Sequence, residues 1–235
     1  MVGEFISIAS LCQTYHLGMV EYGQCLQLQN NLVAARLAGE ISDTILLLQH
    51  FPVITIGASG KEEDILASRD LLDKEKISIF HTDRGGGDTY HGPEQLVGYL
   101  IFDLKIKGEG IHQFVRNLEE VVIQTLDVFS ISAHADPQYP GVWVGQNKIC
   151  AVGVRVKHWV TKHGFALNVN TDLRHFDFII PCGITDRRVT SMSQLLGHDL
   201  PLEEVTSCLL ERCARVFNMD IKQEPAEELN SYYVR

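Results

Sequence analysis

A single cysteine follows an apolar run at residues 178–186, which read FIIPCGITD. Pro181 fixes its own φ angle and lacks an amide donor, and Gly183 permits backbone angles that a side chain would forbid. Structural cysteines usually sit inside helices or strands, where they pack as small hydrophobes. The pattern therefore predicts that Cys182 lies at the end of an element, where a ligand can reach the thiol. A buried bystander is the alternative interpretation.

A glycine-rich stretch, RGGGDTYHGP at residues 84–93, is the second candidate. Three glycines allow the backbone to approach a ligand closely and to present its N–H groups. The stretch matches neither a dinucleotide fingerprint nor a P-loop, because GxGxxG and GKS or GKT are absent. We expect a ligand-binding loop rather than a tight connection between strands.

Lys148 begins an apolar stretch, NKICAVGVR at residues 147–155. A lysine that snorkels at a strand end is the ordinary interpretation. A free thiol has a pKa of about 8.5, and a nearby ammonium lowers this pKa and favours the nucleophilic thiolate. A desolvated lysine can instead act as a base. The sequence leaves both roles open.

His163 precedes another apolar stretch and could pair with a cysteine as in cysteine proteases, but no such protease signature is present. None of the ten histidines falls in a metal-binding spacing such as HExxH, so no metal site is predicted.

Helical and strand patterns alternate along the chain, which predicts an α/β (α+β) fold with a mixed sheet flanked by helices. Apolar residues recur at helical spacing within residues 25–37, 114–129 and from Pro201 onward. Buried strands are expected at residues 44–50, 53–57, 77–80, 95–104, 141–145, 148–156 and 160–169. One main domain over residues 1–220 is expected, with a small C-terminal lobe near residues 185–220. A polar tail would occupy residues 221–235, and the chain is expected to be frayed from Gln223 onward.

The composition is that of an ordinary globular protein, with 45% hydrophobic and 21% charged residues. A net charge of −10 argues against a nucleic-acid partner. Six cysteines without a CxxC pair favour a reducing compartment. The first basic residue is Arg36, and no stretch reaches the ~20 apolar residues of a membrane span, so we expect a cytoplasmic protein without a membrane partner.

Seven stretches taken together resemble the lipoyl(octanoyl) transferase family, the octanoyl-acyl carrier protein:protein N-octanoyltransferases. They are LGMVEY (17–22), LLLQHFPVITIG (46–57), RGGGDTYHGPEQLVGY (84–99), GVWVGQNKICAVGVRV (141–156), HGFALNV (163–169), FIIPCGITD (178–186) and VTSM (189–192). Glu94 departs from the glycine that usually follows HGP in the family.

The resemblance implies a fold similar to that of the biotin and lipoate protein ligases, with Cys182 as the acyl-accepting nucleophile and Lys148 as the residue that activates it. By the same resemblance, substrate contacts fall on Arg84, Gly85, Gly86, Gly87, Asp88, Thr89, Tyr90, His91, Ala151, Val152, Gly153, Gly164, Phe165 and Ala166.

The implied reaction starts from octanoyl-acyl carrier protein, the donor, which transfers its octanoyl group to Cys182 as a thioester. A lysine of a lipoyl domain, in a 2-oxoacid dehydrogenase subunit or in the glycine cleavage H protein, then takes the acyl group as an amide. Lys148 would first stabilise the thiolate and later accept a proton. The reaction implies no cofactor, because thioester exchange is nearly balanced in energy and amide formation is downhill.

Three alternatives remain open. An ATP-dependent lipoate–protein ligase has a similar glycine loop but needs no cysteine at position 182, and here Gln95 follows HGP and Glu94. A non-catalytic module that binds an acyl group would show no turnover, and a cysteine hydrolase would release free octanoate.

The charge distribution suggests a docking surface for acidic partners. The segment from Lys148 to Arg188 holds seven basic and three acidic residues in a chain of net charge −10. We expect Arg155, Lys157, Lys162, Arg187 and Arg188 to form a rim around the Cys182 entrance.

Overall fold

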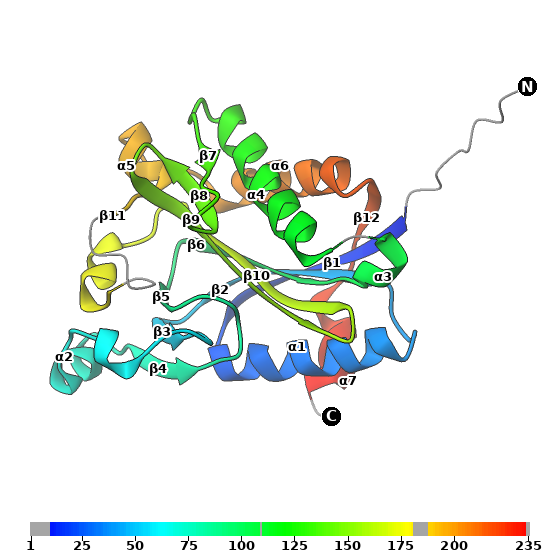
Figure 1. Ribbon diagram of the computed structural model, residues 1–235, viewed down its shortest axis with the longest axis horizontal. Coiled ribbons are helices and arrows are strands. Elements are labelled where there is room, and N and C mark those ends of the chain that lie inside the picture. Colours follow the sequence, from blue (N-terminus) through cyan, green and yellow to red (C-terminus); the bar gives the residue numbers. More distant parts are fainter. Residues whose placement is uncertain (1–9, 109, 181–187, 234–235) are drawn as a thin grey trace, which may run out of the picture.

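The computed structural model describes residues 10–108, 110–180 and 188–233. In this part of the chain, nine strands form one mixed sheet in the order β12-β1-β2-β6-β10-β9-β8-β7, with β11 paired to β9. The neighbours β12, β1 and β2 run parallel, whereas β2, β6, β10, β9, β8 and β7 pair antiparallel in succession. A second sheet of three strands, in the order β4-β3-β5, lies beside the first (Figure 1).

The strands of the main sheet are β1 (Ser10–Val20), β2 (Asp43–His50), β6 (Gln95–Ile101), β7 (His134–Ala135), β8 (Gly141–Val144), β9 (Asn147–Lys157), β10 (Val160–Asn168), β11 (Arg188–Val189) and β12 (Met219–Gln223). Those of the small sheet are β3 (Val53–Ile56), β4 (Ser78–His81) and β5 (Asp88–His91). The α-helices are α1 (Tyr22–Leu37), α2 (Arg69–Lys74), α3 (Leu104–Lys107), α4 (Ile111–Val128), α5 (Met192–Leu196), α6 (Leu202–Val216) and α7 (Asn230–Tyr233). Short 3-10 turns are η1 (Glu62–Asp64), η2 (Leu173–Phe178) and η4 (Ala226–Leu229).

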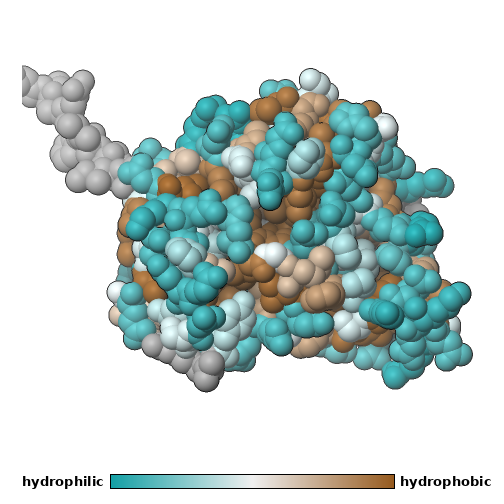
Figure 2. Space-filling model, turned by 180° about the vertical axis from the view of Figure 1, so that it is seen from behind, coloured by the Kyte–Doolittle hydropathy of each residue, from teal (hydrophilic) through white to brown (hydrophobic). Residues whose placement is uncertain are grey.

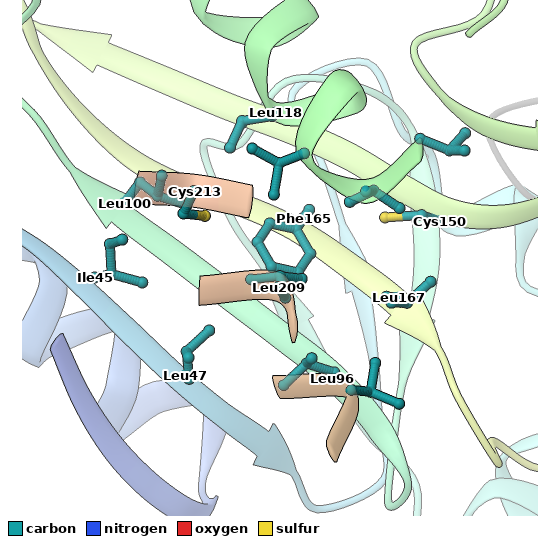
Figure 3. Close-up of a cluster of buried hydrophobic side chains, with 14 of the residues drawn as sticks. Ile45, Leu47, Leu96, Leu100, Leu118, Cys150, Phe165, Leu167, Leu209 and Cys213 are labelled. Carbon is teal, nitrogen blue, oxygen red and sulfur yellow. The ribbon is translucent and has the colours of Figure 1, made fainter. Parts of the chain in front are cut away.

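Helices cover both faces of the main sheet (Figure 1). On one face, α4 and α6 press Leu118, Leu209 and Cys213 onto strand residues that include Leu100 and Phe165 (Figure 3). On the other face, α1 buries Cys25, Leu28 and Leu32 against Leu46 and Tyr99. The two layers leave both faces of β2 and β6 buried, which explains their nearly continuous apolar sequences.

The C-terminal region differs from the expectation in two ways. Helix α6 packs with α4 in the main core rather than in a separate lobe. Residues 221–233 are not a frayed tail, because β12 pairs with β1 and the Leu229 side chain is only 2% exposed. Helix α7 returns to α1, where Asn31 donates a hydrogen bond to the Tyr232 carbonyl (2.6 Å). Strand pairing and a single buried leucine thus hold a segment whose composition is polar.

Candidate active site

One cavity of about 660 Å³ lies where β9 and β10 meet the glycine-rich loop and helix α4. Its volume is within the range usual for small-molecule sites, about 300–1,000 Å³. Strand β9 runs along it from Lys148 to Val154, a distance of roughly 20 Å at about 3.3 Å per residue. The cavity is therefore long enough for an extended chain.

Most of the residues expected to bind substrate line this cavity. They come from three separate parts of the sequence: Arg84, Gly85, Gly86, Gly87, Thr89 and His91; Ala151, Val152 and Gly153; and Gly164, Phe165 and Ala166. Lys148, the expected activating residue, lines the same cavity. The register of the β9–β10 pair explains part of this convergence, because Gly153 lies opposite Gly164 and Ala151 lies opposite Ala166.

Asp88 and Tyr90 are the exceptions: neither residue lines this cavity, and their contact with substrate stays a prediction. Side chains alternate along β5, so Thr89 and His91 face the cavity while Asp88 and Tyr90 point to the other side. Tyr90 packs into a small core with Phe176, at 5.5 Å between ring centroids. Asp88 is buried beside Gly60, where any side chain would collide with its carboxylate.

Arg84 holds the glycine loop in place instead of presenting a free cation. Its side chain is buried, and its guanidinium donates to the Thr55 carbonyl (2.7 Å), to the Thr55 hydroxyl (2.8 and 3.1 Å) and to the Gly85 carbonyl (3.3 Å). Gly85 N–H in turn donates to the Val154 carbonyl (3.1 Å). The loop is thereby attached both to β3 of the small sheet and to β9 of the main sheet.

Glycines are required where this loop meets β9. A Cβ atom at Gly153 would lie 2.7 Å from the Gly85 carbonyl oxygen, and a Cβ atom at Gly57 would lie 2.3 Å from the Gly86 carbonyl oxygen. Real Cβ contacts of this length do not occur, so side chains here would displace the loop. Gly164 similarly allows close contact with the Gly98 carbonyl on β6.

Lys148 lies at the other end of the cavity and is half-buried at the start of β9. Its Nζ donates to the Pro140 carbonyl (3.3 Å) and lies 4.7 Å from the centre of the Trp143 ring. A cation over an indole face is attracted by the ring quadrupole. These contacts hold the ammonium at the edge of the cavity, which the snorkelling interpretation would not require.

Helix α4 and residues 135–140 form a further wall of the cavity, which the sequence motifs did not indicate. Ile111, Val115, Pro137, Tyr139 and Pro140 make it largely apolar, with His112, Arg116, Glu119 and Asp136 as its polar members. Glu119 was detectable in principle, because it stands four residues after Val115 and three before Val122 on the predicted apolar stripe.

Burial favours the neutral form of two histidines that line the cavity, His91 and His163. Burial lowers the pKa of His163 to about 4, even though its Nε2 lies 3.0 Å from the Asp83 carboxylate. Burial also lowers the pKa of His91 well below its usual value. Behind them, His50 bridges the Val20 carbonyl and the Tyr99 hydroxyl, each at 2.8 Å. His163 reaches the cavity opposite Val154, six residues along β9 from Lys148.

Cys182 and Arg187 lie outside the described residues. The described cysteines, at positions 12, 25, 150, 208 and 213, are free thiols. Within residues 10–108, 110–180 and 188–233, no group of three or more His, Cys, Asp or Glu side chains is arranged to hold a metal ion. Among the helices of the same ranges, none has the length and apolar character needed to cross a membrane.

The expected rim of basic residues is wrong in part. Lys162 is only 8% exposed and forms an ion pair with Asp83 (2.9 Å) and a hydrogen bond to Asn30 (2.8 Å). Arg155 and Lys157 are exposed but lie at the far end of β9 from Lys148. Arg188 alone among the described members pairs near Lys148, opposite Asn147.

The fold is that of lipoate and biotin protein ligases. A crystal structure of lipoate-protein ligase A bound with ATP superposes with a TM-score of 0.74 at 18% identity, covering 97% of this chain and 93% of that one. The biotin protein ligase from Aquifex aeolicus gives a TM-score of 0.51 at 16% identity, covering 88% of this chain and 69% of that one. At these identities the likeness concerns the fold alone.

Sequence comparison shows which family within this fold class the chain resembles. The family model of the lipoyl protein ligase A/B catalytic domain matches residues 21–214. The octanoyltransferase of Caldicellulosiruptor saccharolyticus is 50% identical over 219 residues, covering 91% of this chain and 93% of that protein. The octanoyltransferase of Alkaliphilus metalliredigens is 47% identical over 207 residues, covering 88% and 95%. The chain therefore belongs to the octanoyltransferases, a family of acyltransferase enzymes, within the lipoyl protein ligase A/B class.

Proposed function

We propose that this enzyme moves an octanoyl group from octanoyl-acyl carrier protein to a lysine of a lipoyl domain, in 2-oxoacid dehydrogenase subunits and the glycine cleavage H protein. This would be the first step of protein lipoylation. The observation that carries the proposal is the long cavity, in which three family motifs meet, one of them containing Lys148. Its apolar wall, which includes Val115, Val152 and Phe165, suits an alkyl chain.

The proposed reaction has two halves that share Cys182. In the first, the Cys182 thiolate attacks the donor thioester, a new C–S bond forms, and the carrier thiolate leaves. In the second, the acceptor amine attacks the octanoyl-enzyme, a C–N bond forms, and the Cys182 thiolate leaves. The Lys148 ammonium stabilises the thiolate by its charge in the first half and passes a proton toward sulfur in the second.

The other motif residues are proposed to bind the acyl chain. Gly153, Gly164 and Ala166 would let the chain lie against backbone, because larger side chains would fill that space. Arg84 would act through the loop it anchors, since its donors are engaged by Thr55 and Gly85. Asp88 and Tyr90 are left out of this set because they face away from the cavity.

A transfer assay tests this proposal against the ligase alternative. The purified enzyme and an apo lipoyl domain are incubated either with octanoyl-acyl carrier protein without nucleotide, or with octanoate, ATP and Mg²⁺. We expect the lipoyl domain to gain one octanoyl group in the first mixture. Modification only in the second mixture would establish a ligase, and no modification in either would contradict the proposal.

A further inference from the structure

Glu119 is a buried carboxylate that none of the recognised motifs contains. It projects from α4 into the wall of the cavity, and the residue is 6% exposed. Gly141 N–H donates to its Oε1 (2.8 Å). Among the described residues, no partner is found for the second oxygen, which leaves that oxygen available to a ligand in the cavity. A buried carboxylate costs free energy unless a partner compensates it, so its presence here needs an explanation.

A single peptide unit joins Glu119 to Lys148. The N–H of the Pro140–Gly141 peptide bond donates to Glu119, and the carbonyl of the same bond accepts from Lys148 Nζ. With standard bond lengths, the two charged groups lie within about 9 Å of each other. Gly141 has φ +130°, and a Cβ atom there would lie 2.6 Å from the Cys150 carbonyl oxygen. Only glycine fits this position, so the bridge is fixed in place.

The surroundings of Glu119 favour its use as a proton acceptor. Burial raises the pKa of Glu119, whereas the Gly141 N–H, Arg116 and Lys148 each act in the opposite direction. A carboxylate with a raised pKa binds a proton more firmly than an exposed glutamate does. General base catalysis is more efficient when the pKa of the base is closer to that of the group that gives up the proton.

The second half of the proposed reaction requires such a group. A lysine side chain in solution is an ammonium with a pKa of about 10.4, and it cannot attack a thioester until it loses a proton. Lys148, as a cation, repels an incoming ammonium and has no free lone pair to accept that proton. An anion at the same end of the cavity would attract the ammonium and accept a proton from it.

We propose that Glu119 receives the ammonium group of the acceptor lysine and takes its first proton. The freed amine attacks the acyl carbon, the C–N bond forms, and the C–S bond breaks with its electron pair on sulfur. Lys148 passes a proton to that sulfur and regains one from the amine, whose second proton thereby reaches the sulfur through Lys148. The products are the amide, the thiol and protonated Glu119, so that protons and charge balance. This role rests on the proposed function.

The test separates the two halves of the reaction. Octanoyl-enzyme is formed from octanoyl-acyl carrier protein and then mixed with either a lipoyl domain or hydroxylamine, which is largely neutral at pH 7 and needs no base. In Glu119→Gln, the amide oxygen can still accept from Gly141 N–H. We expect its transfer to the lipoyl domain to fall at least about tenfold while discharge to hydroxylamine stays within about twofold of the wild type.

Two further variants complete the experiment. Glu120→Gln makes the same charge change on the exposed neighbour, whose carboxylate accepts from Gln124, and it should behave as the wild type. Glu119→Asp keeps a carboxylate and should recover part of the transfer that Glu119→Gln loses.

Three results would overturn the proposal: unchanged lipoyl transfer in Glu119→Gln, a parallel fall in hydroxylamine discharge, or equal losses in Glu119→Gln and Glu119→Asp. A wild-type enzyme that forms no octanoyl adduct would instead refute the proposed function, so the two failures are distinguishable.

Discussion

Lys148 is held by contacts that a merely solvated lysine would not need. Its Nζ is fixed by the Pro140 carbonyl and the Trp143 ring, so its charge stays at the cavity edge. The residues around Lys148 left its role open, because a lysine at a strand end is usually unremarkable, and only the family motif assigned it a function. The contacts themselves come from residues 140 and 143, which approach Lys148 through the hairpin of β8 and β9.

Substitution of Lys148 should separate its charge from its proton transfer. Lys148→Met removes the cation, so alkylation of Cys182 by iodoacetamide should slow at neutral pH and its pH profile should move to higher pH. Lys148→Arg keeps a charge but cannot release a proton near neutral pH. We expect it to retain much of the alkylation rate while octanoyl transfer to a lipoyl domain falls steeply. Equal retention of both activities would contradict the proton-transfer role.

At the scale of elements, strong periodicity was enough to predict the long core elements. Helices α4 and α6 and strands β2, β8, β9 and β10 lie within a few residues of the predicted ranges. Strands β1, β5 and β12 were missed. β12 has only one buried residue, Met219, and β5 is four residues long beside the glycines, so neither gives a periodic signal. These strands are defined by their pairing partners, which a local pattern does not contain.

One close approach between elements can be tested directly. In Gly153→Ala the new Cβ atom would lie 2.7 Å from the Gly85 carbonyl oxygen, so the loop of residues 84–87 must move off β9. We expect a loss of roughly 1–3 kcal/mol in the free energy of unfolding, as for other overpacked sites, and a higher KM for the octanoyl donor.

The control for this substitution is Gly110→Ala at the N-terminal cap of α4. Its φ angle is −84°, and a Cβ atom there meets nothing within 4 Å. Urea denaturation and steady-state kinetics on both variants would measure the free energy of unfolding and the KM for the octanoyl donor. If Gly153→Ala and Gly110→Ala behave alike, the contact between β9 and the loop does not constrain the site.

At the scale of the whole molecule, a polar surface encloses buried histidines, and we expect these histidines to affect how stability changes with pH. The face shown in Figure 2 is largely hydrophilic around an apolar centre, and the chain carries a net charge of −10. Inside, His50 and His163 have pKa values lowered by burial to about 4. The composition gave no sign of this, since the ten histidines look alike in the sequence and only their burial distinguishes them.

These histidines predict that the fold weakens in mild acid. Between pH 6.5 and about 4, His50 and His163 bind protons in the unfolded chain but stay mostly unprotonated in the folded protein. The free energy of unfolding is therefore unaffected by these two groups above pH 6.5 and decreases as pH falls below that value. The decrease reaches roughly 3 kcal/mol for each group once the pH is below about 4. Urea denaturation at pH 7.5 and 5.0 measures this loss. His50→Gln should lower stability at pH 7.5 but show a smaller decrease on acidification than the wild type; equal decreases would argue against this cause.

The central claim, that octanoyl transfer passes through a thioester on Cys182, is tested most directly by intact mass spectrometry. The enzyme is incubated with octanoyl-acyl carrier protein alone, and the adduct is then mapped by peptide analysis with and without hydroxylamine. We predict one octanoyl group per chain, labile to hydroxylamine and located on Cys182, with neither adduct nor turnover in Cys182→Ala. A Cys182→Ala enzyme that still octanoylates the lipoyl domain would contradict the account.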